Sequence, residues 1–420
     1  MSQAEQAVAL LEVGQVEEAM NILKKIEKDD DLLAKYEAKD VYYQFGFYEE
    51  GIALITDMLK EAPEDGELLV SLSSMYIDIE RDEEAIDLLS DVEEEDPYYL
   101  ASLLMLADLY QMQGLFEVAE AKLFTAKDHA PDELIIDMAL AELMFSIGQF
   151  HRAIPFYEKV LDNNLQIEGI SITERLAECY GTLGKYEEAL KMYDELEEES
   201  PDILFKHGYI AKQLQRNKIA IQKWEELLAM DPDYFSTYTE LAEAYQDEGQ
   251  IKEALETLEK GLRQDEYNKA LYLQLARLHY ESGNIPQAIS FAKEAIALDY
   301  DYKEAILLLV QMYQQKDDYE AIVDLITTIK ETNSEDGDYD WELAKAYEAL
   351  EEYDAALQAY EKAYLALSYD APFLKAYGYF LVEEGLRDRA IQVLSDYLKI
   401  EPEDLDTAEY LDRLSFSNDM

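Results

Sequence analysis

The side chains most able to do chemistry in this sequence are few and scattered. They are the four histidines and the single cysteine, His129, His151, His207, His279 and Cys179. A nucleophile needs a base within hydrogen-bond reach, and a zinc site needs several such ligands at short spacing. The sequence contains no HExxH, GxxxxGK[ST] or G-x-S-x-G motif. It therefore predicts no catalytic residue, no cofactor, no metal site and no enzymatic activity, with Cys179 packed as a small apolar group.

Three alternating acids, Asp336, Asp338 and Asp340, form the pattern closest to a cation site. A calcium loop of the EF-hand type needs a glycine at its sixth position, and this run lacks one. Aspartates that precede a helix usually accept hydrogen bonds from its first N–H groups. We therefore expect these residues to cap a helix rather than to bind calcium.

The charge of the chain limits its partners. Asp and Glu number 94 against 35 Lys and Arg, so the formal net charge is -59. This field repels nucleic acids and anionic membrane surfaces and attracts basic proteins. The first residues lack the basic start of a signal peptide, and no stretch approaches the roughly 18 apolar residues of a membrane helix. We expect a cytoplasmic protein with no nucleic-acid partner and no membrane insertion.

An internal repeat sets the elements that carry these side chains. A small residue recurs, six times in eleven at an interval of 34 residues and never more than three residues away from it, at Ala19, Gly51, Ala85, Ala119, Ala153, Ala189, Ala220, Ala254, Ala288, Ala321, Ala356 and Ala390. Five residues before it a glycine recurs, and nine before it an aromatic residue. Apolar stripes of helical period flank each glycine, where a helix must end. Each unit is therefore predicted to be a helical hairpin.

One unit, residues 100–133, shows the whole pattern, with in-phase positions at Ala107, Tyr110, Gly114, Ala119, Ala126 and Pro131. This pattern resembles the tetratricopeptide repeat (TPR) family. The resemblance implies an all-α, right-handed superhelical TPR solenoid of about twelve helical hairpins plus a C-terminal capping helix. The whole chain, acidic and with 33 tyrosines, is similar to the YpiA-type TPR proteins of Gram-positive bacteria. The fold alone does not specify a ligand.

The repeats predict four segments: a degenerate N-terminal repeat at 1–31, an N-terminal array at 32–168, a C-terminal array at 169–404, and a capping helix with a polar tail at 405–420. The division rests on the long interval from Ala153 to Ala189 and the short one that follows it. The long interval contains the turn-like run 162–171. Either the superhelical twist changes near residue 166, or the run is a harmless loop insertion.

In TPR arrays, the first helix of each hairpin lines a concave groove. Acids two positions before the core aromatic site, and polar or aromatic residues just after it, give the candidate groove residues Asp40, Tyr43, Asp108, Gln111, Glu142, Phe145, Glu178, Glu243, Gln246 and Tyr280. Carboxylates interleaved with aromatic rings suit lysine- or arginine-rich segments. The alternative is that these acids reflect only the general acidity of the chain.

A basic island interrupts this acidity. Between Asp202 and Glu225 the sequence has no acid, and the island carries Lys206, Lys212, Arg216, Lys218 and Lys223. It could contact an acidic neighbour in the same array, a second copy of the chain, or an acidic partner. Self-association is therefore possible, whereas RNA binding is opposed by the surrounding charge.

The sequence as a whole predicts a protein–protein interaction scaffold or adaptor that binds a basic or mixed-charge segment in its groove. Two alternatives stay open. One is an acidic holdase-like chaperone or nucleic-acid mimic that sequesters basic proteins. The other is a regulatory subunit of an enzyme.

Overall fold

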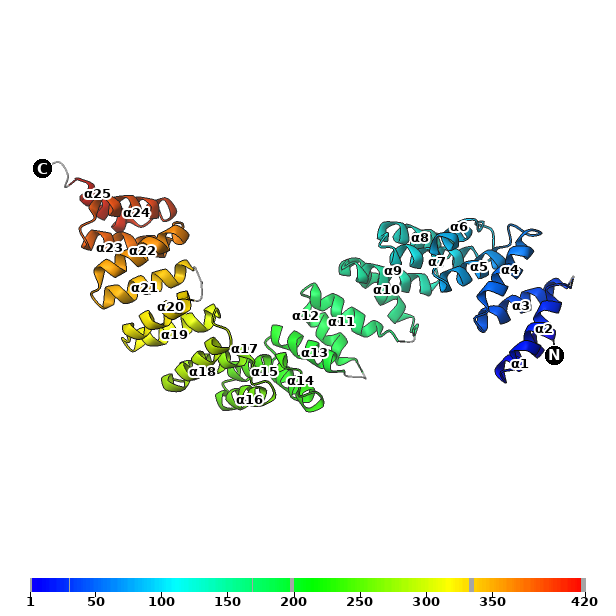
Figure 1. The fold of residues 1–420 in the computed structure, drawn as a ribbon, viewed down its shortest axis with the longest axis horizontal. Coiled ribbons are helices and arrows are strands. Elements are labelled where there is room, and N and C mark those ends of the chain that lie inside the picture. Colours follow the sequence, from blue (N-terminus) through cyan, green and yellow to red (C-terminus); the bar gives the residue numbers. More distant parts are fainter. Residues whose placement is uncertain (1, 30, 168, 197–199, 332–335, 417–420) are drawn as a thin grey trace. The chain divides into compact units, whose positions relative to one another are not determined.

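The computed structural model of this chain describes residues 2–416 except 30, 168, 197–199 and 332–335. Within that part the chain forms 25 helices, and its only β-type pairing is an isolated bridge between Ile167 and Ile170. The chain divides into two compact units, Met1–Glu198 and Glu199–Met420, and each is a stack of helical hairpins (Figure 1). The helix count is consistent with twelve hairpins and one final helix, and the predicted all-α solenoid class is confirmed.

Consecutive helices pair as hairpins in both units. The first unit holds α1 (Gln3–Glu12), α2 (Val16–Ile26), α3 (Leu32–Gln44), α4 (Tyr48–Leu59), α5 (Gly66–Asp78), α6 (Asp82–Ser90), α7 (Tyr99–Met112), α8 (Phe116–His129), α9 (Leu134–Ser146), α10 (Phe150–Asp162), α11 (Ile172–Thr182) and α12 (Tyr186–Asp194). The second holds α13 (Pro201–Gln213), α14 (Asn217–Met230), α15 (Ser236–Asp247), α16 (Ile251–Gln264), α17 (Lys269–Glu281), α18 (Ile285–Leu298), α19 (Lys303–Gln315), α20 (Tyr319–Glu331), α21 (Gly337–Ala349), α22 (Tyr353–Leu367), α23 (Ala371–Glu383), α24 (Arg387–Ile400) and α25 (Leu405–Phe416).

The turn inside each hairpin requires a left-handed backbone residue. Eight of these turns use a glycine, such as Gly114 with φ 74°. Four others place a residue with a side chain in the same region, namely Glu80, Gln215, Asp317 and Glu351. The left-handed conformation costs a non-glycine residue about 1 kcal/mol. The hairpin geometry is therefore kept even in the repeats that lack the glycine signal.

The turn at Asp317 corrects one position of the predicted repeat. We predicted Ala321 as the small residue of its unit, but Ala321 is half-buried whereas Ile322 is fully buried. Counting from Ile322 makes the intervals from Ala288 and to Ala356 both 34 residues. The alanine next to Ile322 misled the sequence comparison.

Tyrosines at the core aromatic position tie neighbouring hairpins together. The hydroxyl groups of Tyr180 and Tyr245 each donate to a carboxylate on the second helix of the preceding hairpin, Glu158 and Glu225, at 2.5 Å. Burial of the ring raises the pKa of both phenols, and the carboxylates raise it further. The ring packs between consecutive hairpins, and its hydroxyl bonds to a carboxylate of the neighbouring hairpin.

The irregular run 162–171 lies inside the first unit. Helices α10 and α11 pack against each other on either side of it, and Asn164 and Gly169 turn the chain with positive φ angles of 53° and 79°. Residue 168, where we predicted the first array to end, is outside the described residues. A change of twist near residue 166 stays a prediction.

Helix α25 covers the end of α24, where a capping helix was predicted. The Asp404 carboxylate accepts hydrogen bonds from the Thr407 backbone N–H at 3.1 Å, the Lys375 Nζ at 2.7 Å and the Tyr397 hydroxyl at 2.7 Å. The Lys375 hydrogen bond and these other donors lower the Asp404 pKa. The predicted polar tail at 417–420 is outside the described residues.

Candidate functional site

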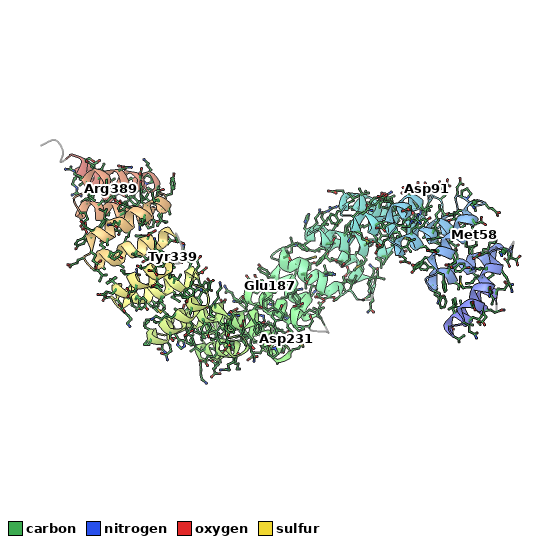
Figure 2. The ribbon with its side chains drawn as sticks, viewed as in Figure 1. Met58, Asp91, Glu187, Asp231, Tyr339 and Arg389 are labelled. Carbon is green, nitrogen blue, oxygen red and sulfur yellow. The ribbon has the colours of Figure 1, made fainter. Side chains whose placement is uncertain are left out.

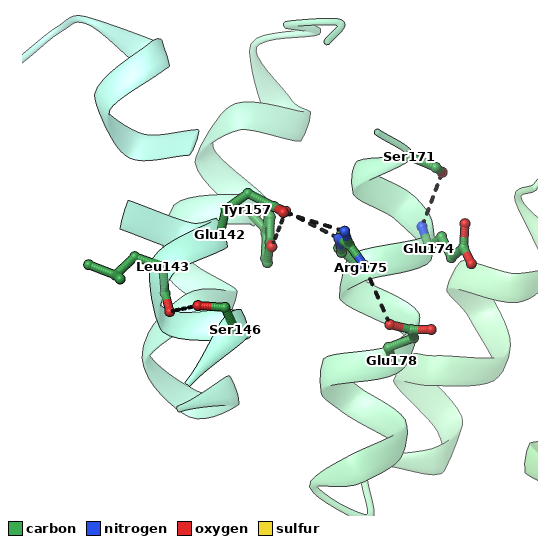
Figure 3. A network of polar contacts seen from close by, with 8 residues as sticks. All are labelled: Glu142, Leu143, Ser146, Tyr157, Ser171, Glu174, Arg175 and Glu178. Atoms are coloured by element: carbon green, nitrogen blue, oxygen red, sulfur yellow. Dashed lines mark hydrogen bonds and ion pairs between the residues drawn. The ribbon is translucent and has the colours of Figure 1, made fainter. Parts of the chain in front are cut away.

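The first helices of consecutive hairpins form a surface that we call the A-helix face. In the first unit its central feature is Arg175 on α11 (Figure 3). The Arg175 Nε donates to Glu142 Oε1 of α9 at 3.2 Å, and its Nη1 lies 3.9 Å from Glu178 Oε2. The guanidinium also lies over the Phe145 ring, 4.5 Å from its centroid. The structure therefore brings together three predicted residues, Glu142, Phe145 and Glu178, around an arginine that the sequence analysis missed.

Glu142 is further fixed from its own hairpin. The Tyr157 hydroxyl of α10 donates to its Oε1 at 2.5 Å. Burial and this hydrogen bond to Glu142 both raise the Tyr157 pKa. Glu142 thus has partners on two sides before any ligand arrives.

The second unit satisfies its A-helix acids in the same way. Lys212 on α13 places its Nζ 2.8 Å from Glu240 and 2.6 Å from Glu243, both on α15. The Gln274 side chain of α17 donates to the other Glu243 oxygen at 3.1 Å. Burial opposes the charge of Lys212, but the hydrogen bonds to Glu240 and Glu243 outweigh it and raise the Lys212 pKa. Glu243 was predicted to face a partner, and it lies inside this network.

A common register explains both networks. Arg175 and Gln274 each stand fourteen residues before the reference alanine of their unit, and their acceptors stand eleven before the alanine of the preceding unit. Stacking places these two positions side by side across consecutive hairpins. Aligning them would have revealed the pairs from the sequence, but only with the knowledge that the two positions meet.

Asp108 on α7 breaks this register. Ala139 of α9 occupies the position that Arg175 and Gln274 hold in their units, and it has no donor to offer. Within the described residues Asp108 forms no hydrogen bond or ion pair. Its carboxyl group is open to solvent on one side yet crowded by the surrounding chain, and this desolvation raises its pKa. Asp108 is therefore a carboxylate on the A-helix face that lacks the partner its counterparts have.

The remaining predicted residues of this face are dispersed. The Asp40 carboxylate is 2.7 Å from Lys39 Nζ, which also reaches Glu67 at 3.0 Å. The rings of Tyr43 and Tyr48 have centroids 6.1 Å apart. Gln246 donates to Glu281 at 2.6 Å, while Gln111 and Tyr280 are half-buried. A recognition row that joins all ten predicted positions stays a prediction.

The basic island is largely engaged within its own unit. Lys212 neutralises α15 as described, and Lys223 pairs with Glu226 at 3.1 Å. Lys206 and Arg216 also have interaction partners, whereas Lys218 is exposed. An acidic neighbour in the same array, one of the three roles predicted for the island, therefore accounts for Lys212, whereas the Lys223–Glu226 pair lies within helix α14.

The side chains that could do chemistry have structural surroundings. Cys179 is fully buried, and burial raises its pKa to about 12. Burial lowers the pKa of His279, which stacks on Phe291 with ring centroids 5.4 Å apart. In the described part of the chain no group of three or more His, Cys, Asp or Glu is placed to hold a metal ion. None of the described helices is long and apolar enough to cross a membrane.

Of the three alternating acids near residue 338, only Asp336 caps a helix as we predicted, and Asp338 and Asp340 pair with lysines. Asp336 is the N-cap of α21 and accepts a hydrogen bond from the Asp338 backbone N–H at 2.9 Å. Lys303 Nζ lies 2.6 Å from both Asp336 and Asp338, below the buried Tyr339 ring that Figure 2 marks. Lys330 pairs with Asp340. These carboxylates are used by a helix end and by two lysines.

Two cavities occur on a different surface, where the second helices of consecutive hairpins meet. One in the first unit is lined by α10, α11 and α12, with Leu161, Leu176 and Tyr180 among its residues. One in the second unit is lined by α14, α15 and α16, with Leu228, Leu241 and Tyr245 among its residues. These residues hold the same repeat positions in both units. The sequence analysis did not predict either cavity.

Comparison with known proteins identifies the family. The chain is 38% identical over 402 residues, 94% of each chain, to the TPR repeat-containing protein YpiA of Bacillus subtilis (strain 168). It belongs to the YpiA-like family of TPR proteins. Models of YpiA-like tetratricopeptide repeats match residues 111–165, and models of the YpiA-like C-terminal repeats match 338–404. General TPR models match 175–202, 205–269 and 246–301. The resemblance predicted from the sequence is confirmed.

Two solved structures are among those similar to this YpiA-like chain. YrrB, described as a TPR protein with an unusual peptide-binding site, is 19% identical with a TM-score of 0.38, over 44% of this chain and 95% of that one. The APC/C hetero-tetramer Cut9-Hcn1 is 14% identical with a TM-score of 0.36, over 99% of this chain and 96% of that one.

Proposed function

We propose that this chain is a non-enzymatic scaffold or adaptor that binds a basic or mixed-charge segment of a partner protein on its A-helix face. The observation that carries the proposal is Asp108, whose carboxyl group lacks the cross-hairpin donor that Glu142 and Glu243 have. A lysine or arginine of a partner would supply that missing donor.

The energetics favour Asp108 over its counterparts as a contact. A ligand that approaches Glu142 or Glu243 must compete with Arg175 or Lys212, so little net interaction is gained. At Asp108 the desolvation that raises the carboxyl pKa is already present in the free protein. A charge-assisted hydrogen bond there would offset that cost, and such bonds contribute about 1.5–3 kcal/mol.

A matched pair of variants tests this proposal. The probe is a fluorescein-labelled peptide in which lysines alternate with leucines, titrated into the full chain and followed by fluorescence anisotropy. Asp108→Asn should weaken binding about tenfold, a change of about 1.4 kcal/mol. Glu243→Gln removes the same charge from the equivalent position and should change affinity less than twofold.

Equal losses in the two variants would overturn the proposal. They would mean that the peptide responds only to net charge, as the sequestering alternative requires, and the binding would then also disappear at about 0.5 M salt.

A further inference from the structure

The cavity of the first unit has an apolar floor and a carboxylate rim. Leu176 and Met192 are buried beneath it and Leu161 is half-buried. Four carboxylates line it, those of Glu158, Asp162, Glu188 and Glu195, together with one ammonium group, that of Lys191. The second helix of this hairpin is α12, on which Figure 2 marks Glu187.

The equivalent cavity of the second unit differs in charge but not in construction. Its lining carries one carboxylate, Glu225, and one ammonium group, Lys260. Both cavities have a core tyrosine whose hydroxyl donates to the rim glutamate at 2.5 Å, Tyr180 to Glu158 and Tyr245 to Glu225. The same repeat geometry therefore produces an acidic cavity in one unit and a balanced one in the other.

Three lining positions differ between the two cavities, and two further charged residues of the first, Glu188 and Lys191, correspond to Glu253 and Glu256, which do not line the second. Asp162 of the first cavity corresponds to Ala229 of the second, Glu195 to Lys260, and Met192 to Thr257. Asp162 is the last residue of α10 and begins the irregular run 162–171. The repeat that departs from the regular interval is thus also the one whose cavity gathers acids.

We propose that the cavity between α10, α11 and α12 is a second docking site, which takes the lysine or arginine side chain of a partner protein together with the apolar residues beside it. The aliphatic stem of that side chain packs on Leu161, Leu176 and Met192. Its cationic head reaches the rim carboxylates, and the flanking apolar residues cover the open edge. Long cationic side chains are suited to such a site because stem and head have opposite solvation preferences.

The arrangement of the acids favours a side chain over a bare ion. The carboxylates are spread around the cavity, and within the described residues no three of them are placed to hold a metal ion. The cation already present in the cavity, the ammonium group of Lys191, is only weakly bound by its partner carboxylate. Lys191 reaches Glu195 only at 3.7 Å, and both side chains are largely exposed. An exposed pair of this kind contributes little, so a partner cation can replace Lys191.

The rim glutamate is held in position before binding. Tyr180 donates to Glu158 Oε1, which leaves the second oxygen for a ligand. Glu188 makes no hydrogen bond or ion pair within the described residues. Its negative charge is one of the causes that raise the pKa of Tyr180. The two carboxylates therefore meet a cation without first breaking an ion pair.

The test uses the methyl group of Met192 as a local reporter. The full chain, labelled with 13C in its methionine methyl groups, is titrated with the peptide acetyl-Gly-Leu-Lys-Leu-Gly-amide and with its norleucine analogue in place of lysine. We expect the Met192 resonance, assigned by Met192→Leu, to shift and saturate with the lysine peptide at about 0.15 M salt. The analogue should bind about tenfold more weakly.

The two cavities supply matched variants that the fold already accepts. Asp162→Ala with Glu195→Lys gives the first cavity the residues of the second at these two positions, and should reduce lysine-peptide affinity about tenfold. Ala229→Asp with Lys260→Glu and Thr257→Met does the reverse. It should produce a new methionine methyl resonance that shifts with the peptide.

The Met192 methyl resonance also shows which results would contradict the proposal. An unmoved Met192 signal, or an equal shift in the Asp162→Ala, Glu195→Lys variant, would overturn the proposal. Equal shifts with the two peptides would also overturn it, because the cation would then be irrelevant. The proposal is independent of Asp108: Asp108→Asn leaves the Met192 shift unchanged, so either site can fail without the other.

Discussion

The two units share the same repeat geometry but differ in how their charged side chains are placed. In the second unit, Lys212 lies between Glu240 and Glu243 on the A-helix face, and Lys260 lines the cavity between second helices. In the first unit the corresponding cavity is lined by four carboxylates and one ammonium group, that of Lys191. In the hairpin that follows Asp108 of the first unit, Ala139 likewise holds the repeat position that carries a donor beside Glu142 and Glu243. The backbone geometry of the hairpins is shared, so the difference lies in where the few cations are placed.

This comparison shows how a strongly acidic solenoid can be selective. A net charge of -59 produces a long-range field that would attract any basic protein, and salt screens this field beyond roughly 8 Å. Discrimination must then come from close contacts. A carboxylate that is already paired gives a partner little, whereas one without a partner gives a charge-assisted hydrogen bond.

The largest expected effect concerns Cys179, which reports on opening of the first unit. Its pKa of about 12 means that at pH 8 it should react with iodoacetamide roughly a thousandfold more slowly than an exposed thiol. The matched reporter of the second unit is Ala244→Cys in a Cys179→Ala background, because Ala244 is buried at the same repeat position. Different alkylation rates would show that the units open separately, and fast alkylation of Cys179 in the folded chain would contradict its burial.

Removing the cation of the second unit should have the next largest effect. Lys212→Ala leaves Glu240 and Glu243 without their shared partner and should lower the free energy of unfolding by about 1–2 kcal/mol. Both tryptophans, Trp224 and Trp341, lie in the second unit. Intrinsic fluorescence during denaturation therefore reports on this unit.

Two further variants control for charge and for the side-chain stem of Lys212. Lys252→Ala removes an exposed lysine that pairs with Glu256 at 3.2 Å, and it should change stability by less than about 0.5 kcal/mol. Lys212→Met keeps the stem. If Lys212→Ala also had no effect, the second unit would not depend on its internal cation, and the comparison between the units would lose its basis.

The equivalent change in the first unit should be smaller. Arg175→Ala removes the contacts to Glu142 and Glu178 and the stacking on Phe145, and it should destabilise the unit by about 1 kcal/mol. Earlier alkylation of Cys179 with rising denaturant would measure this loss. Freed of Arg175, Glu142 should also bind the lysine–leucine peptide, making the first unit more acidic still.

Arg175→Lys is the matched control, because it keeps the charge without the planar two-donor geometry. A peptide affinity that rises in Arg175→Ala but not in Arg175→Lys would support the idea that internal cations decide where partners bind. Unchanged affinity in both would contradict it.

The smallest expected effect is a gain of stability on removing a proposed contact. Burial raises the Asp108 pKa in the folded state, so the folded state holds its proton to higher pH than the unfolded state does. The wild type should therefore lose stability as pH rises from about 4, the unfolded value, through the raised folded pKa. Asp108→Asn should abolish this loss and raise the denaturation midpoint slightly at pH 7.

The reference for this effect is Glu243→Gln, which removes an acid that is already paired. It should lower the midpoint at pH 7 instead. If the denaturation midpoint moved in the same direction in both variants, Asp108 would not differ from the paired acids of the A-helix face.

Much of the fold was predictable because the repeat is written into the order of residues. Small residues, turn glycines and core tyrosines recur in phase, and each has a local physical reason. Where one signal was missing, as at Glu80 and Gln215, the other positions still marked the turn. Ala321 was assigned wrongly because the sequence analysis looked for a small residue. The 34-residue interval instead places Ile322, which is fully buried, at that position.

The candidate site was predictable only in part, because similar residues acquire different surroundings. Asp108, Glu142 and Glu243 occupy one repeat position and look equivalent in the sequence. The next hairpin contributes Ala139, Arg175 or Gln274 to the space beside them, and that contact spans more than thirty residues of sequence.

The sequence by itself determined the fold class, the hairpin turns and the acidic character of this protein, since these depend on residue type and on local spacing. Only the tertiary structure decided which acids are neutralised and where a cavity with an acidic rim forms. The physical reason is that charge pairing acts over a few ångströms, and the stacking of hairpins sets which side chains come within that distance.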